Sequence, residues 1–184
     1  MATCALLLLD FSGVTHAATS WAIDPAGSRL DFTATQAGGE FDGTFQRFRA
    51  EIAFDPADLA GSRFQVEIET GSAATGDKDR DQTLAGNDFF AATRWPTARF
   101  EADRFVALGG DRYEARGRLT IRDVTREVRL PFRFQPAAGG TAAGMIGGTT
   151  IRRLDFGVGR GEWGDTSLVG DEVRIHFELR MHRR

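Results

Sequence analysis

Apolar and polar residues alternate along most of the chain after residue 20. In the run from Leu30 to Ala34, the apolar Leu30, Phe32 and Ala34 alternate with Asp31 and Thr33. A period of two is typical of a β-strand with one buried and one exposed face. The same alternation recurs in segments 48–54, 64–68, 98–102, 113–121, 128–134 and 173–179, and more weakly in the glycine-rich segment 145–151.

Turn-forming residues separate these eight runs, at 25–27, 38–39, 55–56, 109–111 and 138–140. An open sheet of eight two-faced strands would leave a large apolar face in water. Closing the sheet into a barrel buries that face and removes the unpaired edges. The sequence therefore predicts an all-β, eight-stranded antiparallel barrel, whose interior is just wide enough to be filled by side chains or to hold one small ligand.

The segment from Thr75 to Trp95 breaks the alternation. It predicts a short helix near residues 81–90, with Leu84 and Phe89 facing inward, that covers one mouth of the barrel. Trp95 ends this segment because a residue that precedes a proline disfavours the helical conformation.

The first 18 residues resemble a secretory signal peptide. Residues 5–9 form a short apolar run, and small residues at 14–18 offer a cleavage site. No basic residue precedes the run and Asp10 interrupts it, which we interpret as a mis-assigned start codon. We expect residues 1–18 to be a signal peptide and 19–184 to be an exported barrel domain, and the alternative is a cytosolic leader. Cleavage would also remove Cys4, the only cysteine.

Composition excludes several classes of function. The formal net charge is −3, so no basic excess favours nucleic-acid binding. The expected mature chain keeps only His176 and His182, both expected on the surface, and it has no Gly-x-Ser-x-Gly turn, so nucleophilic catalysis is hard to assemble. Too few histidines and cysteines remain for a zinc site. We therefore expect no catalytic residue, no cofactor and no metal.

Two local motifs resemble known ligand loops but fail in detail. The acidic run from Asp77 to Asp81 resembles the start of a calcium loop, but Gln82 and Asp88 stand where that loop requires glycine and glutamate. Residues 159–164 match Gly-x-Gly-x-x-Gly, but no helical pattern follows them. We interpret both segments as ordinary loops.

Phenylalanine is the remaining chemical signal, with 15 residues in the chain. Many fall on the inward faces of the predicted strands, together with small residues such as Ala50, Ala98 and Gly117. Large and small residues mixed in this way can leave an apolar tunnel that suits a long lipid chain. A solid aromatic core without a ligand remains the alternative.

Taken in order, several segments resemble the YceI-like family, the polyisoprenoid-binding, lipocalin-like proteins of bacteria. The resemblance covers about residues 21–179. It rests on Trp21–Asp24, Ser28–Phe32, Gly43–Phe45, Ile52–Pro56, Thr75–Gly76, Arg80–Asp81 with Leu84, Phe89–Phe90, Trp95–Pro96 with Phe100, Gly117–Thr125, and Arg152 with Asp155–Val158.

The resemblance implies a lipocalin-like barrel around an elongated apolar cavity, in the periplasm of a Gram-negative-type bacterium. It implies an isoprenoid or another long amphiphile as ligand, quinone-like ligands included, and it adds two partners: a second copy of the chain, and a membrane b-type cytochrome in transient contact. Leu84 and Phe89 would cover the mouth. The residues expected to line the cavity are Phe32, Phe48, Ile52, Phe54, Ile68, Leu84, Phe89, Phe100, Leu119 and Ile121.

Arg80 and Arg152 are the candidates for binding a ligand head group, because a guanidinium can pair with a phosphate through two hydrogen bonds. Their alternative role is a structural ion pair, for instance with Asp81 or Asp155. The sequence thus predicts a periplasmic lipid-binding or carrier protein rather than an enzyme. Two alternatives remain: an enzyme that acts on a bound isoprenoid through buried carboxylates, and a stress-related barrel with a solid core.

Overall fold

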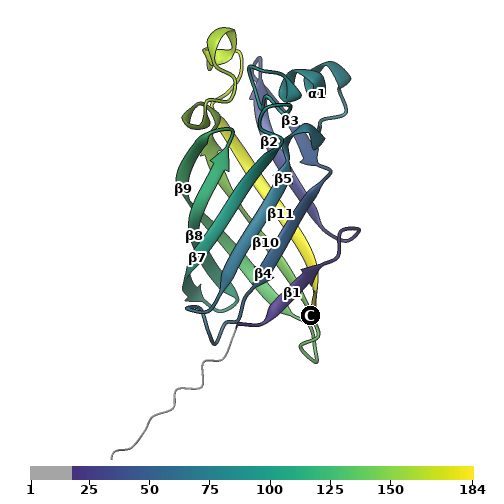
Figure 1. Ribbon diagram of the computed structural model, residues 1–184, viewed down its shortest axis with the longest axis vertical. Helices are drawn as coiled ribbons and strands as arrows, with labels where there is room; N and C mark the ends of the chain where they lie inside the picture. Colours follow the sequence, from purple (N-terminus) through teal and green to yellow (C-terminus); the bar gives the residue numbers. More distant parts are fainter. Residues whose placement is uncertain (1–17) are drawn as a thin grey trace, which may run out of the picture.

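The structure is a computed structural model that describes residues 18–184, so the expected signal peptide lies outside the described residues except for Ala18. Within this range the chain forms eleven strands, one α-helix and three short 3-10 turns (Figure 1). The strands are β1 (Ser20–Ile23), β2 (Arg29–Gln36), β3 (Gly39–Phe45), β4 (Phe48–Ala53), β5 (Arg63–Glu69), β6 (Ala73–Ala74), β7 (Thr97–Gly109), β8 (Arg112–Ile121), β9 (Val124–Pro136), β10 (Ala142–Arg152) and β11 (Glu172–Arg183). The helix is α1 (Lys78–Ala85), and the turns are η1 (Thr70–Ser72), η2 (Arg153–Phe156) and η3 (Gly161–Gly164).

The described strands close into an antiparallel barrel of eight, with the short β6 added at one edge of β3. Two of the eight barrel strands are interrupted, so each is made of two shorter strands in line: β1 with β2, and β3 with β4. β11 pairs with both β1 and β2, while β4 pairs with β1 and β3 pairs with β2. Apart from the pairing of β6 with β3, all other pairs join barrel strands that follow one another along the chain. The predicted eight-stranded antiparallel barrel is therefore confirmed.

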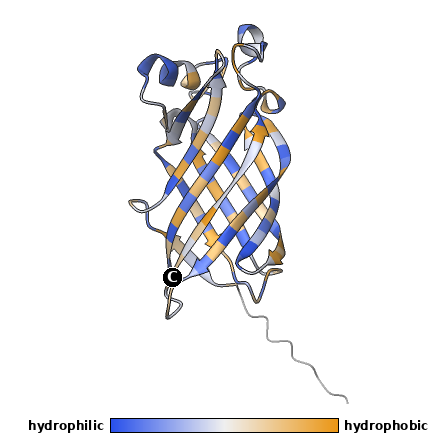
Figure 2. Cartoon of the chain, turned by 180° about the vertical axis from the view of Figure 1, so that it is seen from behind, coloured by the Kyte–Doolittle hydropathy of each residue, from blue (hydrophilic) through white to orange (hydrophobic). Residues whose placement is uncertain are grey.

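The alternation of the sequence becomes the inside and the outside of the barrel. Along β8, for example, Ala115, Gly117, Leu119 and Ile121 are buried. Orange and blue alternate along the strands in Figure 2 for the same reason. His176 lies on the outer face of β11 and is exposed, as its position between two apolar residues predicts.

Aromatic rings fill one end of the barrel. Phe54 is 0% exposed. Its ring centroid lies 5.0 Å from that of Tyr113, 5.2 Å from that of Phe132 and 5.0 Å from that of Phe134, all in edge-on arrangements. Trp21 packs against Phe134 at 5.5 Å, and its indole Nε1 donates a hydrogen bond to the carbonyl oxygen of Phe54 at 3.0 Å. This end, called the aromatic end below, has a solid core.

Helix α1 and the loops 86–96 and 153–171 cover the opposite end, at the top of Figure 1. The helix begins earlier than predicted because Asp77 caps it: the carboxylate accepts hydrogen bonds from the backbone N–H groups of Asp79 at 3.0 Å and Arg80 at 3.1 Å. It ends at Ala85, before Gly86. None of the helices formed by residues 18–184 is long and apolar enough to cross a membrane.

Candidate functional site

Two hollows lie inside the barrel, and their walls present only apolar atoms. The lower hollow, of about 90 Å³, adjoins the aromatic end, and the upper hollow, of about 100 Å³, lies below α1. Ile68, Leu119 and Ile175 line both, so the two hollows form one elongated apolar site that these three side chains divide. Each part has the size of a small ring or a short stretch of hydrocarbon.

The structure gathers nine of the ten apolar residues singled out in the sequence around these hollows. Phe54 is the exception. Its ring faces the interior but lies in the aromatic end, where it fills the core and lines neither hollow. Of the others, Phe32, Leu84, Phe89 and Ile121 line the upper hollow, Phe48, Ile52 and Phe100 line the lower one, and Ile68 and Leu119 line both.

A third hollow of about 220 Å³ lies at the mouth beside α1. Leu84 and Phe89 line both this hollow and the upper interior one, so they separate the interior from the mouth. Arg80 lies here. Its guanidinium packs 4.2 Å from the centroid of the Phe41 ring, and its Nε donates to the side-chain oxygen of Gln36 at 3.2 Å.

Arg152 does not reach either interior hollow. It is the last residue of β10, it is exposed, and it makes no ion pair with Asp155 or any other described residue. The buried arginine is its neighbour Arg153, which is 4% exposed and lines the upper hollow. The structure therefore places Arg152 on the outer face of the barrel, away from both interior hollows, and the head-group role inferred for it stays a prediction.

The strand alternation would have identified Arg153. Met145 faces the interior, and steps of two along β10 lead through Gly147, Thr149 and Ile151 to Arg153, on the same face. Arg152, the candidate taken from the resemblance, lies one residue earlier and on the opposite face.

All five N–H groups of the Arg153 guanidinium donate to backbone carbonyl oxygens. The acceptors belong to the loop that covers the mouth, so the side chain fixes this loop and has no donor left for a ligand. Burial lowers the pKa of Arg153 from its ordinary value, and the nearby Asp171 carboxylate opposes that shift. The acceptors are Gly170 at 2.9 Å, Val158 at 2.9 Å, Gly159 at 2.6 Å, Trp163 at 2.6 Å and Val169 at 2.7 Å.

A second arginine links loop 86–96 to loop 153–171 through hydrogen bonds. Arg122, in the tight turn between β8 and β9, donates to the carbonyl oxygens of Phe89 at 3.0 Å and Gly157 at 2.7 Å. Its guanidinium also lies 4.6 Å from the centroid of the Trp95 ring. Arg122 and Arg153 together hold the covered mouth closed.

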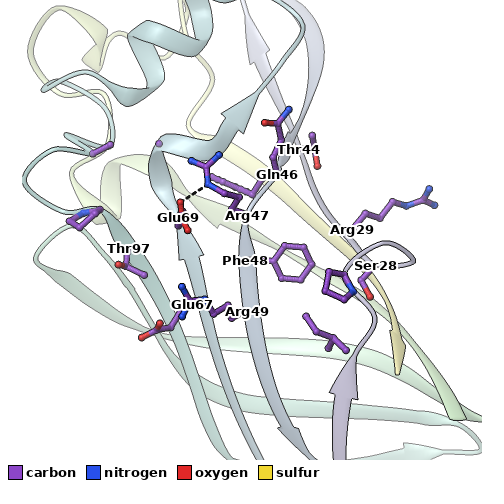
Figure 3. Close-up of a pocket in the computed structure, with 16 residues that line it drawn as sticks. Ser28, Arg29, Thr44, Gln46, Arg47, Phe48, Arg49, Glu67, Glu69 and Thr97 are labelled. Carbon is purple, nitrogen blue, oxygen red and sulfur yellow. Dashed lines mark hydrogen bonds and ion pairs between the residues drawn. The ribbon is translucent and has the colours of Figure 1, made fainter. Parts of the chain in front are cut away.

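A fourth hollow, which the sequence analysis did not predict, lies on the side of the barrel (Figure 3). This side hollow has a volume of about 860 Å³ and lies where both interrupted barrel strands break. Arg47 and Glu69 on its rim form an ion pair at 2.6 Å. Only the pairing of the strands reveals that the two breaks lie side by side, so the linear pattern could not show it.

Apolar side chains make up most of the lining of the two interior hollows. No group of three or more histidine, cysteine, aspartate or glutamate side chains in this range is placed to hold a metal ion. No carboxylate or imidazole belongs to the lining of either interior hollow. What the site offers is apolar surface.

Comparison with known proteins agrees with this geometry. A UPF0312 protein of Vibrio cholerae is 30% identical over 165 residues, which is 86% of each chain. The crystal structure of BcnA from Burkholderia cenocepacia matches with a TM-score of 0.81 and 36% identity, over 86% of this chain and 98% of that one. The YceI protein of Campylobacter jejuni matches with a TM-score of 0.68 and 25% identity, over 77% of this chain and 84% of that one.

A more distant solved structure shares the fold. It is a polyisoprenoid-binding domain from Saccharophagus degradans implicated in plant cell wall breakdown, with a TM-score of 0.73 and 16% identity over 90% of this chain and 99% of that one. The family model described as the YceI-like domain matches residues 21–181, almost the whole described barrel. The chain therefore belongs to the YceI-like domain family.

Proposed function

We propose that this barrel binds the hydrocarbon chain of a long amphiphile, a polyisoprenoid or a quinone-like lipid, in its two interior hollows. The observation that carries the proposal is the purely apolar wall of both hollows. Burial of hydrocarbon in such a wall contributes about 0.8 kcal/mol per CH₂ and requires no precisely placed polar group. The site therefore fits a class of chains rather than one molecule.

The shape of the site favours a slender ligand. Neither hollow alone approaches the roughly 300 Å³ of an ordinary small-molecule pocket. A long chain fits when Ile68, Leu119 and Ile175 turn aside and the two hollows join. The polyisoprenoid-binding domain from Saccharophagus degradans, which shares the fold, supports this choice of ligand.

Binding, rather than catalysis, is the role that the interior supports. An enzyme that used buried carboxylates would need an acidic side chain against the ligand. The buried polar side chains of the described residues are Ser62, Thr70, Ser72 and Arg153. All of them hydrogen-bond to the backbone, so none is free to act as a general acid or base on a bound chain.

The proposal extends to the setting of the protein. We propose that the chain is exported to the periplasm as a lipid carrier, supported by the apolar run and small residues of segment 1–18 and by the family. A homodimer and a transient contact with a membrane b-type cytochrome belong to the same proposal and rest on the family resemblance alone.

The test combines native mass spectrometry of protein purified from its own periplasm with extraction of any bound lipid. A second measurement uses a fluorescent amphiphile with a geranylgeranyl chain. Leu119→Trp should weaken binding of this probe at least tenfold, because the larger ring fills the boundary between the two hollows. Arg118→Trp is the matched control, because it places the same ring on the outer face of β8. Wild-type protein that carries no lipid and does not bind the probe would refute the proposal, as would a Leu119→Trp variant that binds normally.

A further inference from the structure

The wall of the barrel is interrupted beneath the side hollow. β1 pairs with β4 from Ser20 opposite Ala53 to Ala22 opposite Glu51, and the ladder resumes only where Asp31 of β2 faces Thr44 of β3. Between these points, residues 23–30 and 45–50 do not pair with one another. We call this stretch the seam.

Two aromatic rings, Phe48 and Phe45, close the seam. Phe48 lines both the side hollow and the lower interior hollow, so its side chain stands between solvent and the apolar site. In Figure 3 the Phe48 ring projects from β4 towards the turn that carries Ser28. Phe48 is only partly buried, although it faces the interior. Phe45 has the same position between the side hollow and the upper hollow.

The two sides of the Phe48 ring differ in polarity. On the outer side, Arg47 pairs with Glu69 at 2.6 Å, Glu67 pairs with Arg99 at 3.1 Å, and Arg49 forms no ion pair within residues 18–184. On the inner side the wall is apolar. The change from polar to apolar surface across one ring matches an amphiphile whose chain lies inside and whose polar end stays in the water-facing side hollow.

The covered mouth is a less suitable entrance. Arg122 and Arg153 fasten its two loops through hydrogen bonds to backbone carbonyl groups, and Leu84 and Phe89 fill the way in. Opening the mouth requires several of these hydrogen bonds to break. Opening the seam requires no ladder bond to break, because none joins residues 23–30 to residues 45–50.

We propose that the seam is a lateral opening of the ligand site, with Phe48 as its gate, and that the side hollow receives the polar end of the bound amphiphile. This inference rests on the proposed function, because it presupposes a hydrocarbon chain in the interior hollows. It assigns the side hollow as a second part of the binding site, distinct from the mouth.

The test is a stopped-flow measurement of association and dissociation rates with the fluorescent geranylgeranyl probe on the full chain. Phe48→Ala should raise the association rate about tenfold, equivalent to about 1.4 kcal/mol of barrier, and the dissociation rate at least as much. Phe48→Trp should slow both. Thermal unfolding checks that each variant folds, and Phe48→Leu, with a smaller increase in both rates, replaces any alanine variant that does not.

Two control variants are needed. One tests whether Phe48 controls entry of the ligand or only lines the site, and the other tests whether the ligand enters through the seam or through the mouth. Leu119→Ala removes only interior lining, so it should raise the dissociation rate and leave association unchanged. Leu84→Ala widens the mouth, and it should raise the association rate less than Phe48→Ala does. A faster association in Leu84→Ala together with unchanged rates in the Phe48 variants would overturn the lateral opening while the proposed function stands. Wild-type protein that does not bind the probe would overturn both.

Discussion

Two neighbouring arginines show how strongly the fate of a side chain depends on the face of the strand that carries it. Arg152 is exposed on the outer face of the barrel, whereas Arg153 is buried and donates to five backbone carbonyl groups. A buried carbonyl group that loses its only donor costs about 1–3 kcal/mol. The two residues therefore form a natural pair for measuring what a buried guanidinium contributes to stability.

We predict that Arg153→Ala lowers the free energy of unfolding by more than about 3 kcal/mol, because several buried carbonyl groups lose their donors at once. Arg152→Ala should change it by less than about 0.5 kcal/mol, because that side chain is exposed. Urea denaturation of both variants, followed by tryptophan fluorescence, measures the difference. Similar losses in the two variants would contradict the assignment of Arg153 as the residue that holds the loop.

The alternation of residues predicts which face a side chain lies on, but not how far along the barrel axis it lies. Phe54 illustrates this. Its inward orientation follows from the pattern, yet its position in the aromatic end depends on where each strand sits relative to its neighbours. The seam could not be predicted from the sequence for a similar reason. The residues at 25–27 predict a turn between two strands, but they do not show that this turn lies beside a break in the adjacent strand.

At the scale of elements, α1 depends for its position on the residue that caps its N-terminus. Asp77 caps the helix, and the backbone N–H of Arg80 lowers the pKa of the Asp77 carboxyl from its ordinary value of 3.8. A lowered pKa means that the ionised carboxylate stabilises the folded helix. That stabilisation is present above pH 3.8 and is lost as the pH falls through the lowered pKa.

We predict that Asp77→Ala speeds amide hydrogen exchange at Asp79 and Arg80, because their N–H groups lose the acceptor. In the wild-type protein the same amides should lose protection only below pH 3.8, after correction for the intrinsic exchange rate. Asp77→Asn, which keeps a capping oxygen without the charge, should retain most protection and remove the pH dependence. Exchange that is equally slow in Asp77→Ala would show that tertiary contacts, and not the cap, hold α1.

At the scale of the whole molecule, the barrel combines a solid end and a hollow middle. The sequence left a solid core and an apolar tunnel as alternatives. In the structure, rings pack around Phe54, and two separate apolar hollows, rather than a continuous tunnel, lie above them. Eight strands explain how both fit into one barrel. At this size, phenylalanines facing one another fill the interior, while smaller residues such as Ala50 and Ala98 leave space.

We predict that Phe54→Ala lowers the free energy of unfolding by about 3–5 kcal/mol, because it leaves a cavity within packed rings. Probe binding should change little in the folded variant, because Phe54 lines neither hollow. Denaturant titration gives the first quantity and fluorescence titration at low denaturant gives the second. A large loss of probe affinity in folded Phe54→Ala would show that the ligand reaches into the aromatic end.

The packed rings of the aromatic end also close the barrel interior at that end. A hydrocarbon tail that enters from the side or from above cannot pass the rings around Phe54, so its terminal carbon stops there. The depth of the interior from these rings to the Phe48 ring then determines the length of hydrocarbon chain that the lower hollow can hold. Tails shorter than this depth leave part of the hollow empty, and longer tails must fold or extend into the upper hollow, so affinity plotted against chain length should reach a plateau.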